Sequence, residues 1–348
     1  MVTITEITSD DGSNGGDPNK KQQEKENQNE NATQQQFLYA LIGFPPLEIP
    51  RWFILHRINN SLQLSFIVSL PPLTPGSAVV TIGHDMYIFG GGLSPNPPLV
   101  NVSVVDCRFH TRRRLPNMRR GRYHAAAGVI DGKIYVIGGC IKQGGDWIEV
   151  FDVNTQRWVY EPVHGHGVPN YPNFVTSFDG VFGESVVLED KIYILDRMCW
   201  LVYEPRRRRW KSLGDESVLR EFWNGSCCVI DDLLYTIDPL SVLGYPIVVF
   251  DPKGKDWRTV KGVQRYELIN YGNCQYKVAN LGGKLVILCR YESLYGWDYD
   301  FMDRDIWCIV IALEKRDDGE ILGHVESKSS VLSCFMLAMI EHSRTVTV

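Results

Sequence analysis

A hairpin motif returns along the chain at intervals of a few dozen residues, and this repetition limits the fold more than any other feature. The segments Val79–Gly91 (VVTIGHDMYIFGG) and Ala127–Gly139 (AGVIDGKIYVIGG) align without a gap. Three more divergent copies follow, at Ser185–Arg197, Cys227–Pro239 and Val278–Arg290. A period of this length is typical of solenoids and propellers, in which each repeat is one supersecondary unit.

Each copy has the pattern of two short apolar strands around a tight turn. The turns are Gly83–Asp85, Asp131–Gly132, Glu189–Asp190, Asp231–Asp232 and Gly282–Gly283. Asp-Gly and Gly-Gly pairs are favoured in two-residue hairpins because both turn residues need a positive φ. The sequence therefore predicts a β-hairpin in each copy.

A second hairpin follows the first in three of the repeats. An apolar strand leads to an acidic residue, a polar turn and then Trp158, Trp210 or Trp257. We expect these tryptophans to pack in outer strands, because large aromatic side chains contribute mainly through burial. Two hairpins per repeat make a four-stranded sheet, so the sequence predicts an all-β propeller with one sheet, or blade, per repeat.

The repeats divide most of the predicted propeller domain, residues 37–348, into blades. Their expected ranges are residues 75–120, 121–170, 171–218, 219–265 and 266–326. A closing blade is expected from residues 37–60 together with 327–348. Each end contributes two outer strands, which we place at Phe37–Phe44, Arg51–Arg57, Val331–Ile340 and Thr345–Val348. Combining both ends in one blade gives a six-bladed ring and protects the sheet edges.

Residues 1–36 differ in composition from the rest of the chain. They contain seven acidic residues and three lysines, a charge of −4 out of the chain's −5, and very few apolar side chains. Such a segment cannot bury enough surface to offset the conformational entropy lost on folding. We therefore predict a disordered polar tail. The nearly neutral remainder gives no argument from bulk charge for nucleic-acid or membrane partners.

The cysteines and the N-terminus bear on cellular location. Nine cysteines, an odd number without a C-x-x-C pair, suit free thiols in a reducing compartment better than a disulfide framework. The N-terminus lacks the apolar core of a signal peptide. The longest apolar stretch, Val331–Ile340, is much shorter than a membrane helix. We expect a soluble protein of the cytoplasm, the nucleus or both.

The repeats resemble kelch repeats. The likeness rests on the hairpin, the Tyr and Gly-Gly doublet near its end, and the Trp after the next turn; Arg122–Gly139 (RYHAAAGVIDGKIYVIGG) is a close match. The doublet is replaced by Asp196–Arg197, Asp238–Pro239 and Cys289–Arg290 in the last three copies. The likeness covers about residues 75–325.

The whole arrangement is similar to the plant F-box/kelch-repeat family. That resemblance implies a propeller that recruits a protein or peptide substrate for ubiquitination, while an N-terminal F-box docks to the scaffold adaptor of an SCF-type ubiquitin ligase. An F-box has an apolar, Leu-Pro-bearing helical core, and we do not expect the polar segment 1–36 to encode one. The ligase connection therefore comes from the resemblance alone.

The glycine run Gly90–Gly92 allows two interpretations. Glycines after a strand can present backbone N–H groups to a phosphate when a helix begins directly afterwards. Here Pro95, Pro97 and Pro98 follow, and they do not allow such a helix. We predict instead that Gly90 and Gly91 end a strand where neighbouring blades crowd the backbone.

Catalytic and metal-binding patterns are weak. His164 and His166 could share a metal ion, but no acidic or Cys ligand lies near them in sequence. Some plant kelch proteins are iron-dependent enzymes with Glu, Asp and His spaced four apart; His110 has Asp106 but Val102 in place of the Glu. We therefore predict a non-catalytic protein without cofactor or metal. The alternatives are a kelch-only scaffold outside the ubiquitin system and a metal-dependent propeller enzyme.

Two basic clusters, Arg112–Arg122 and Arg206–Arg209, could contact phosphates or an acidic peptide. We expect the second to be a solvated turn of an outer hairpin. Recognition sites for proteins are rich in Tyr, Trp and Arg, and the loops after the Gly-Gly position and between blades should meet on one face. The residues predicted there are Arg122, Tyr123, Tyr171, Arg197, Trp223, Tyr271, Arg290, Tyr291 and Tyr295.

Overall fold

The structure is a computed structural model. It describes residues 35–44, 48–92, 97–140, 147–159, 183–195, 200–213, 218–223, 225–268, 275–290, 305–334 and 337–348. Gln36–Val348 forms one compact unit. The predicted tail therefore lies almost wholly outside the described residues, which begin at position 35. None of the helices in the described ranges is both long and apolar enough to cross a membrane.

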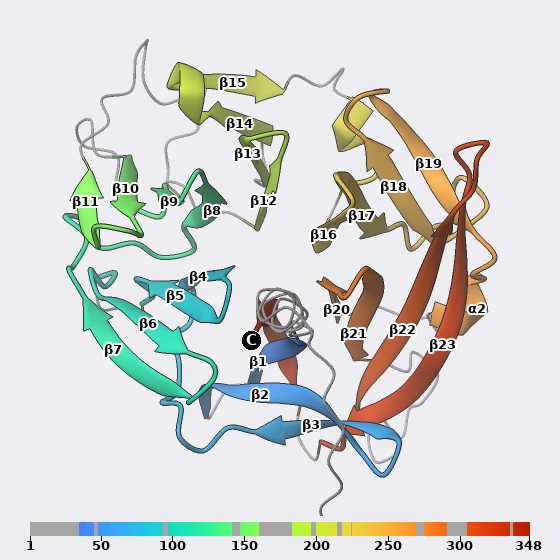
Figure 1. Cartoon of the computed structure of the whole chain (residues 1–348), viewed down its shortest axis with the longest axis horizontal. Helices are drawn as coiled ribbons and strands as arrows, with labels where there is room; N and C mark the ends of the chain where they lie inside the picture. Colours follow the sequence, from blue (N-terminus) through green and yellow to red (C-terminus); the bar gives the residue numbers. More distant parts are fainter. Residues whose placement is uncertain are drawn as a thin grey trace, which may run out of the picture. The chain divides into compact units, whose positions relative to one another are not determined.

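The described strands form four four-stranded sheets and one eight-stranded sheet, set around a common centre as in a propeller (Figure 1). Three of the four-stranded sheets are sequential meanders. The first contains β4 (Ala78–Ile82), β5 (Asp85–Phe89), β6 (Val102–Asp106) and β7 (Thr111–Leu115). The second contains β8 (Ala126–Ile130), β9 (Lys133–Ile137), β10 (Ile148–Asp152) and β11 (Arg157–Val159). The third contains β12 (Glu184–Leu188), β13 (Lys191–Leu195), β14 (Trp200–Glu204) and β15 (Arg209–Leu213).

The eight-stranded sheet joins two antiparallel meanders. One contains β16 (Cys227–Ile230), β17 (Leu233–Ile237), β18 (Ile247–Asp251) and β19 (Asp256–Lys261). The other contains β20 (Gln275–Leu281), β21 (Lys284–Arg290), β22 (Ile306–Lys315) and β23 (Ile321–Leu332). β19 pairs in parallel with β23, Val260 opposite Ile321 and Lys261 opposite Leu322. β23 is long enough to reach the outer edge of the neighbouring meander, where backbone groups need partners.

The closing sheet combines both ends of the described unit. Its order is β24 (Met339–Thr347), β1 (Gln36–Phe44), β2 (Glu48–Ile58) and β3 (Ser61–Phe66). β1 and β2 each have partners on both edges and β24 is the innermost strand, so the expectation that these segments are outer strands of the closing blade is wrong. The outer strand is β3, whose alternating sequence SLQLSF contains no apolar run. Val331–Ile340 is also not one strand, because β23 ends at Leu332 and β24 begins at Met339.

The predicted tight turns adopt left-handed backbone conformations. Asp131, Glu189 and Asp231 have φ values of 50°, 50° and 49°, and the residue after each also has a positive φ. Asp tolerates this region better than most residues with a Cβ. The hairpins predicted from the repeats are confirmed.

The hydrophobic core lies between neighbouring sheets. Tyr87 and Phe89 of β5 pack with Ile134 and Phe151 of the next sheet. β5, β9 and β17 are buried on both faces, which explains their continuous apolar sequences rather than alternating ones.

The tryptophans of the outer strands attach the incoming connections. Trp158 Nε1 donates to the carbonyl oxygen of Pro116 (2.8 Å), and Trp257 Nε1 donates to that of Val218 (2.6 Å). Val218 belongs to a short 3₁₀ helix, η2 (Val218–Arg220). Trp158 and Trp257 thus each anchor the connection that leads into their own sheet, and both lie in outer strands as predicted.

Candidate functional site

The innermost strands define two ends of the ring. β24 runs parallel to β4, the innermost strand of the next sheet. His342 Nε2 lies 3.0 Å from the carbonyl oxygen of Ser77, and Arg344 Nε donates to the carbonyl oxygen of Val79 (2.9 Å). The innermost strands β4, β8, β12, β16 and β20 are each followed by a tight hairpin turn. We call the end with these turns the hairpin face. The opposite end, which carries the connections between sheets, is the loop face.

On the loop face, the connection from β7 to β8 is held between two glycine doublets. The Gly91 N–H donates to the carbonyl oxygen of Arg122, and the Tyr123 N–H donates to that of Gly139, both at 2.8 Å. Gly90 has a φ of 65°, and a Cβ there would overlap the Arg122 carbonyl oxygen. The glycine run is therefore a junction between sheets, as predicted.

Arg122 fixes this connection from inside the protein. Its side chain is fully buried, and its Nε and Nη2 donate to Glu149 Oε1 at 3.2 and 3.0 Å. Nη1 donates to the carbonyl oxygen of Trp147 at 3.0 Å. Glu149 Oε2 in turn accepts the Arg119 N–H at 2.7 Å. Arg122 consequently presents no side-chain atom to a partner and acts by positioning the loop.

The connection from β17 to β18, residues 238–246, presents apolar side chains to solvent. Leu240 is 74% exposed, Val242 68% and Leu243 41%. Asp238 shapes the segment, because its Oδ1 accepts the Leu240 N–H at 3.0 Å and its Oδ2 accepts the Val242 N–H at 2.6 Å. The Asp238 side chain itself is buried. We call residues 238–246 the apolar loop.

Further exposed apolar residues lie in other connections of the loop face. Val68 lies between β3 and β4, Leu99 between β5 and β6, and Leu337 between β23 and β24. Tyr266 lies on the short helix α2 (Arg265–Leu268), between β19 and β20. Exposed apolar side chains thus recur in several connections of the loop face.

Polar groups line the ring centre near the loop face. A cavity of about 50 Å³ is bordered by Ser77, His124, Glu184, His342 and Arg344 among other residues. Lys277 forms an ion pair with Glu184 across the innermost strands. Burial lowers the pKa of His342 well below its usual value. These contacts link β24, β4, β12 and β20, so the cluster serves to close the ring.

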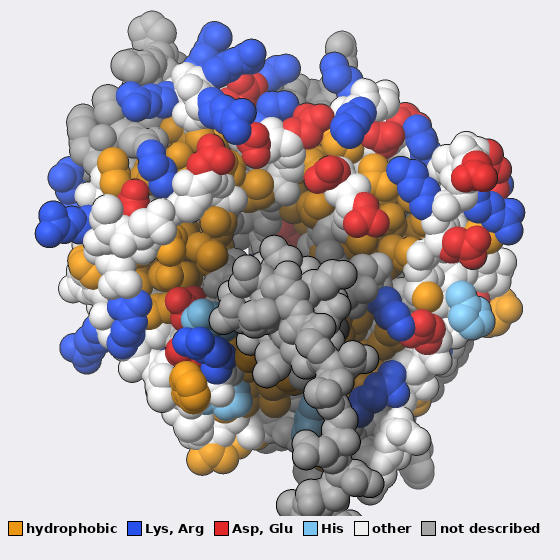
Figure 2. Space-filling view, viewed as in Figure 1, with side chains coloured by type: hydrophobic (Ala, Val, Ile, Leu, Met, Phe, Trp, Pro, Cys, Tyr) orange, Lys and Arg blue, Asp and Glu red, His pale blue; other side chains and the backbone are white. Residues whose placement is uncertain are grey.

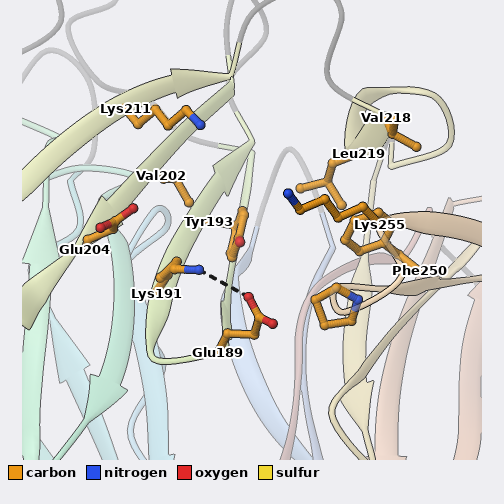
Figure 3. A pocket seen from close by; sticks show the side chains of 11 residues that line it. Glu189, Lys191, Tyr193, Val202, Glu204, Lys211, Val218, Leu219, Phe250 and Lys255 are labelled. Carbon is orange, nitrogen blue, oxygen red and sulfur yellow. Dashed lines mark hydrogen bonds and ion pairs between the residues drawn. The ribbon is translucent and has the colours of Figure 1, made fainter.

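Figure 2, taken from the direction of Figure 1, shows Lys, Arg, Asp and Glu side chains spread around the rim of the molecule. A groove of about 340 Å³ opens between the third sheet and the β16–β19 meander (Figure 3). Its walls combine charged residues, among them Lys211 and Lys255, with apolar ones such as Tyr193 and Phe250.

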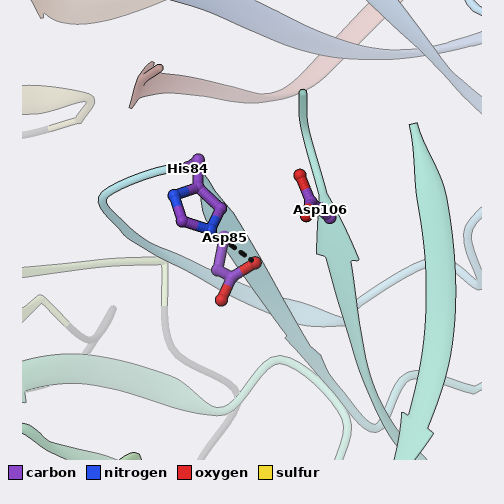
Figure 4. A group of neighbouring side chains, drawn as sticks. All are labelled: His84, Asp85 and Asp106. Carbon is purple, nitrogen blue, oxygen red and sulfur yellow. Dashed lines mark ion pairs between the residues drawn. The ribbon is translucent and has the colours of Figure 1, made fainter. Parts of the chain in front are cut away.

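One group of potential metal ligands lies at the hairpin face: His84, Asp85 and Asp106 (Figure 4). His84 Nε2 is 3.8 Å from Asp85 Oδ1. Asp106 is already engaged, because Arg108 Nη2 donates to its Oδ2 at 2.7 Å. This bonding lowers the Asp106 pKa to about 2. A cation at this position would compete with the Arg108 guanidinium.

Comparison with known proteins identifies the family. The model of the FKB95 Kelch-repeats domain matches residues 52–332. The chain is a kelch-repeat protein. A kelch repeat-containing protein of Arabidopsis thaliana is 47% identical over 319 residues, which cover 89% of this chain and 74% of that protein. An Arabidopsis F-box/kelch-repeat protein is 46% identical over 314 residues, 89% of this chain and 79% of the relative.

Two further matches extend the comparison. An F-box/LRR-repeat/kelch-repeat protein of Arabidopsis thaliana is 42% identical over 400 aligned positions that cover all of both chains. Among solved structures, that of YjhT matches the kelch protein with a TM-score of 0.48 and 14% identity, over 79% of this chain and 91% of YjhT.

The structure of the kelch protein revises part of the predicted site. Arg122, Trp223 and Arg290 have buried side chains, with Trp223 packed on Trp200 and bonded to the carbonyl oxygen of Gly225. Tyr123 is half-buried and packs edge-on against His124. The other predicted residues lie outside the described residues: Tyr171, Arg197, Tyr271, Tyr291 and Tyr295, and with them His164 and His166.

The apolar loop was missed by sequence reasoning. Its sequence, DPLSVLGYP from Asp238 to Pro246, replaces the Gly-Gly doublet with Asp-Pro and places Leu and Val between a proline and a glycine. Apolar residues outside the strand pattern, bounded by Pro and Gly, were the available signal.

Proposed function

We propose that this kelch protein is a non-catalytic, six-bladed propeller that recognises a protein or peptide substrate at its loop face. It acts as the substrate-recognition component of an SCF-type ubiquitin ligase in the cytoplasm or nucleus. The β16–β19 and β20–β23 meanders count as two blades beside the four separate sheets. The ligase connection is supported by relatives that carry the name F-box/kelch-repeat protein.

The apolar loop is the observation that carries the recognition proposal. Leu240, Val242 and Leu243 are exposed although the Asp238 carboxylate holds their backbone in a defined conformation. A preformed loop loses little conformational entropy on binding, so more of the apolar contact contributes to affinity. Tyr266 on the same face adds an aromatic side chain of the type common in binding hot spots.

The test compares proteins captured by the wild type and by Leu240→Asp/Val242→Asp from an extract of Arabidopsis, the organism of the relatives. The matched control is Phe109→Asp, because Phe109 is 69% exposed but lies in the hairpin turn between β6 and β7. We expect a partner retained by the wild type and the control and lost by the double variant. Equal capture by all three proteins would contradict recognition at the loop face.

Ligase membership needs a separate measurement. We expect the ligase scaffold adaptor to co-purify with the full chain and its captured partner. A partner without the adaptor would support the other function, a kelch scaffold outside the ubiquitin system, for which relatives named only kelch repeat-containing proteins are the precedent. Stoichiometric iron or zinc in the purified protein, together with turnover of a substrate, would contradict the non-catalytic assignment.

A further inference from the structure

The groove between the third sheet and the β16–β19 meander combines an apolar floor with cationic walls. Tyr193 and Val202 contribute from β13 and β14, Leu219 from η2, and Phe250 and Pro252 from the end of β18 and the turn after it. Val218, at the margin, is 45% exposed. Val202, Leu219 and Phe250 are only 3%, 4% and 6% exposed, so the apolar surface open to a ligand comes mainly from half-buried Tyr193 and from Val218.

Two lysines reach toward this gap from opposite walls. Figure 3 shows Lys211 extending from β15 and Lys255 from the β18–β19 turn. In the part of the chain that the structure describes, neither ammonium group has a carboxylate partner. The two carboxylates that line the groove form ion pairs with other side chains: Glu189 with Lys191 and Glu204 with Arg207, each at 3.1 Å.

The turn between β14 and β15 adds more positive charge beside the groove. Arg206 to Arg209 occupy this turn and the start of β15. Arg206 is paired with Asp190 at 2.9 Å and lies 3.8 Å from Asp131, and Arg207, Arg208 and Arg209 follow it in the sequence. The basic cluster noticed in the sequence thus lies on the hairpin that forms one wall of an apolar groove.

We infer that this groove binds an acidic segment of a partner protein in which carboxylates flank a large apolar side chain. The apolar side chain packs on Tyr193 and Val218, and the flanking carboxylates meet Lys211 and Lys255. Charge complementarity selects this partner over a neutral peptide. A polyphosphate fits less well, because it has no apolar group to pack on Tyr193 and Val218.

The experiment measures fluorescence anisotropy of a fluorescein-labelled peptide, EEFEELE, titrated with the full chain. The comparison peptides are EEGEESE, which keeps the carboxylates without the apolar side chains, and KKFKKLK, which reverses the charge. We expect EEFEELE to bind more tightly than either, and its affinity to fall with added salt because the charged contacts are screened.

Two kinds of variant assign the binding to the groove. Lys211→Glu/Lys255→Glu is expected to weaken EEFEELE binding about tenfold or more, and Val218→Asp is expected to weaken it through the apolar margin. The matched control is Lys315→Glu/Arg316→Glu, which changes charge equally at the exposed β22–β23 turn of the same face. Thermal unfolding of each variant checks that it is folded.

The proposal is overturned if EEFEELE binds the groove variants and the control with equal affinity, or if EEGEESE binds as tightly as EEFEELE. It is also overturned if a single-stranded DNA oligonucleotide binds more tightly than EEFEELE and loses affinity in the same variants, which would make the groove a general polyanion site. Leu240→Asp/Val242→Asp should leave peptide binding unchanged, so this site and loop-face recognition can fail independently.

Discussion

Replacing Arg122 with methionine separates a structural role from a binding role for this side chain. Arg122→Met removes the cation but leaves the mostly buried Glu149 carboxylate without its ion-pair partner. It also removes the bond to the Trp147 carbonyl oxygen. Breaking a buried ion pair from one side costs about 3–5 kcal/mol, equivalent to a fall of about 10²–10⁴-fold in the folded-to-unfolded ratio.

The assay is urea denaturation followed by tryptophan fluorescence. Arg122→Met should lower the free energy of unfolding by about 3–5 kcal/mol, whereas Arg113→Met, at an exposed position of β7, should change it by less than about 0.5 kcal/mol. Arg122→Met/Glu149→Gln should lose less than the sum of its single variants, because the unpaired charge is gone. A loss below about 1 kcal/mol for Arg122→Met would refute the structural role.

Three further outcomes follow from the geometry. Gly90→Ala should destabilise the protein by about 2–5 kcal/mol and Gly83→Ala by about 1–2 kcal/mol in denaturation experiments, because both have a positive φ but only a Cβ at Gly90 meets backbone. Asp238→Ala should speed protease cleavage within residues 239–245, seen by mass spectrometry, because two N–H bonds of the apolar loop are lost; unchanged cleavage would contradict the role of Asp238. Burial lowers the pKa of His342 in the folded state, so the unfolded state is protonated first as the pH is lowered. The free energy of unfolding should therefore decrease as the pH falls below about 6.5, by up to about 1.4 kcal/mol per pH unit. His342→Gln should flatten this slope; an identical pH profile in the variant would contradict it.

The fold could be predicted from the sequence because its signals are local and repeated. The turn at Asp131–Gly132 and the tyrosines of the hairpins identify the same unit several times, so errors in one copy are corrected by the others. The pairing of β19 with β23 could not be predicted, because it depends on the length of β23 and on which edge it meets in space. β3 was missed because its half-buried, alternating residues give a weak pattern.

The site was harder to predict than the fold because side-chain type does not reveal burial. Arg122 and Trp223 have the composition of binding hot spots, yet one forms an internal ion pair and the other packs on Trp200. The exposed residues of the apolar loop are leucine and valine, which a sequence reader assigns to the core. The hydrogen bonds of Asp238, together with those between backbone groups of the loop, show how it is held in place.

Hydrogen–deuterium exchange of the kelch protein, alone and with its captured partner, tests the central claim most directly. Recognition at the loop face predicts slower exchange of backbone N–H groups in residues 238–246 and 67–70, with no change at the hairpin turns 131–132 and 282–283. Protection confined to the hairpin turns, with residues 238–246 exchanging as in the free protein, would contradict the account.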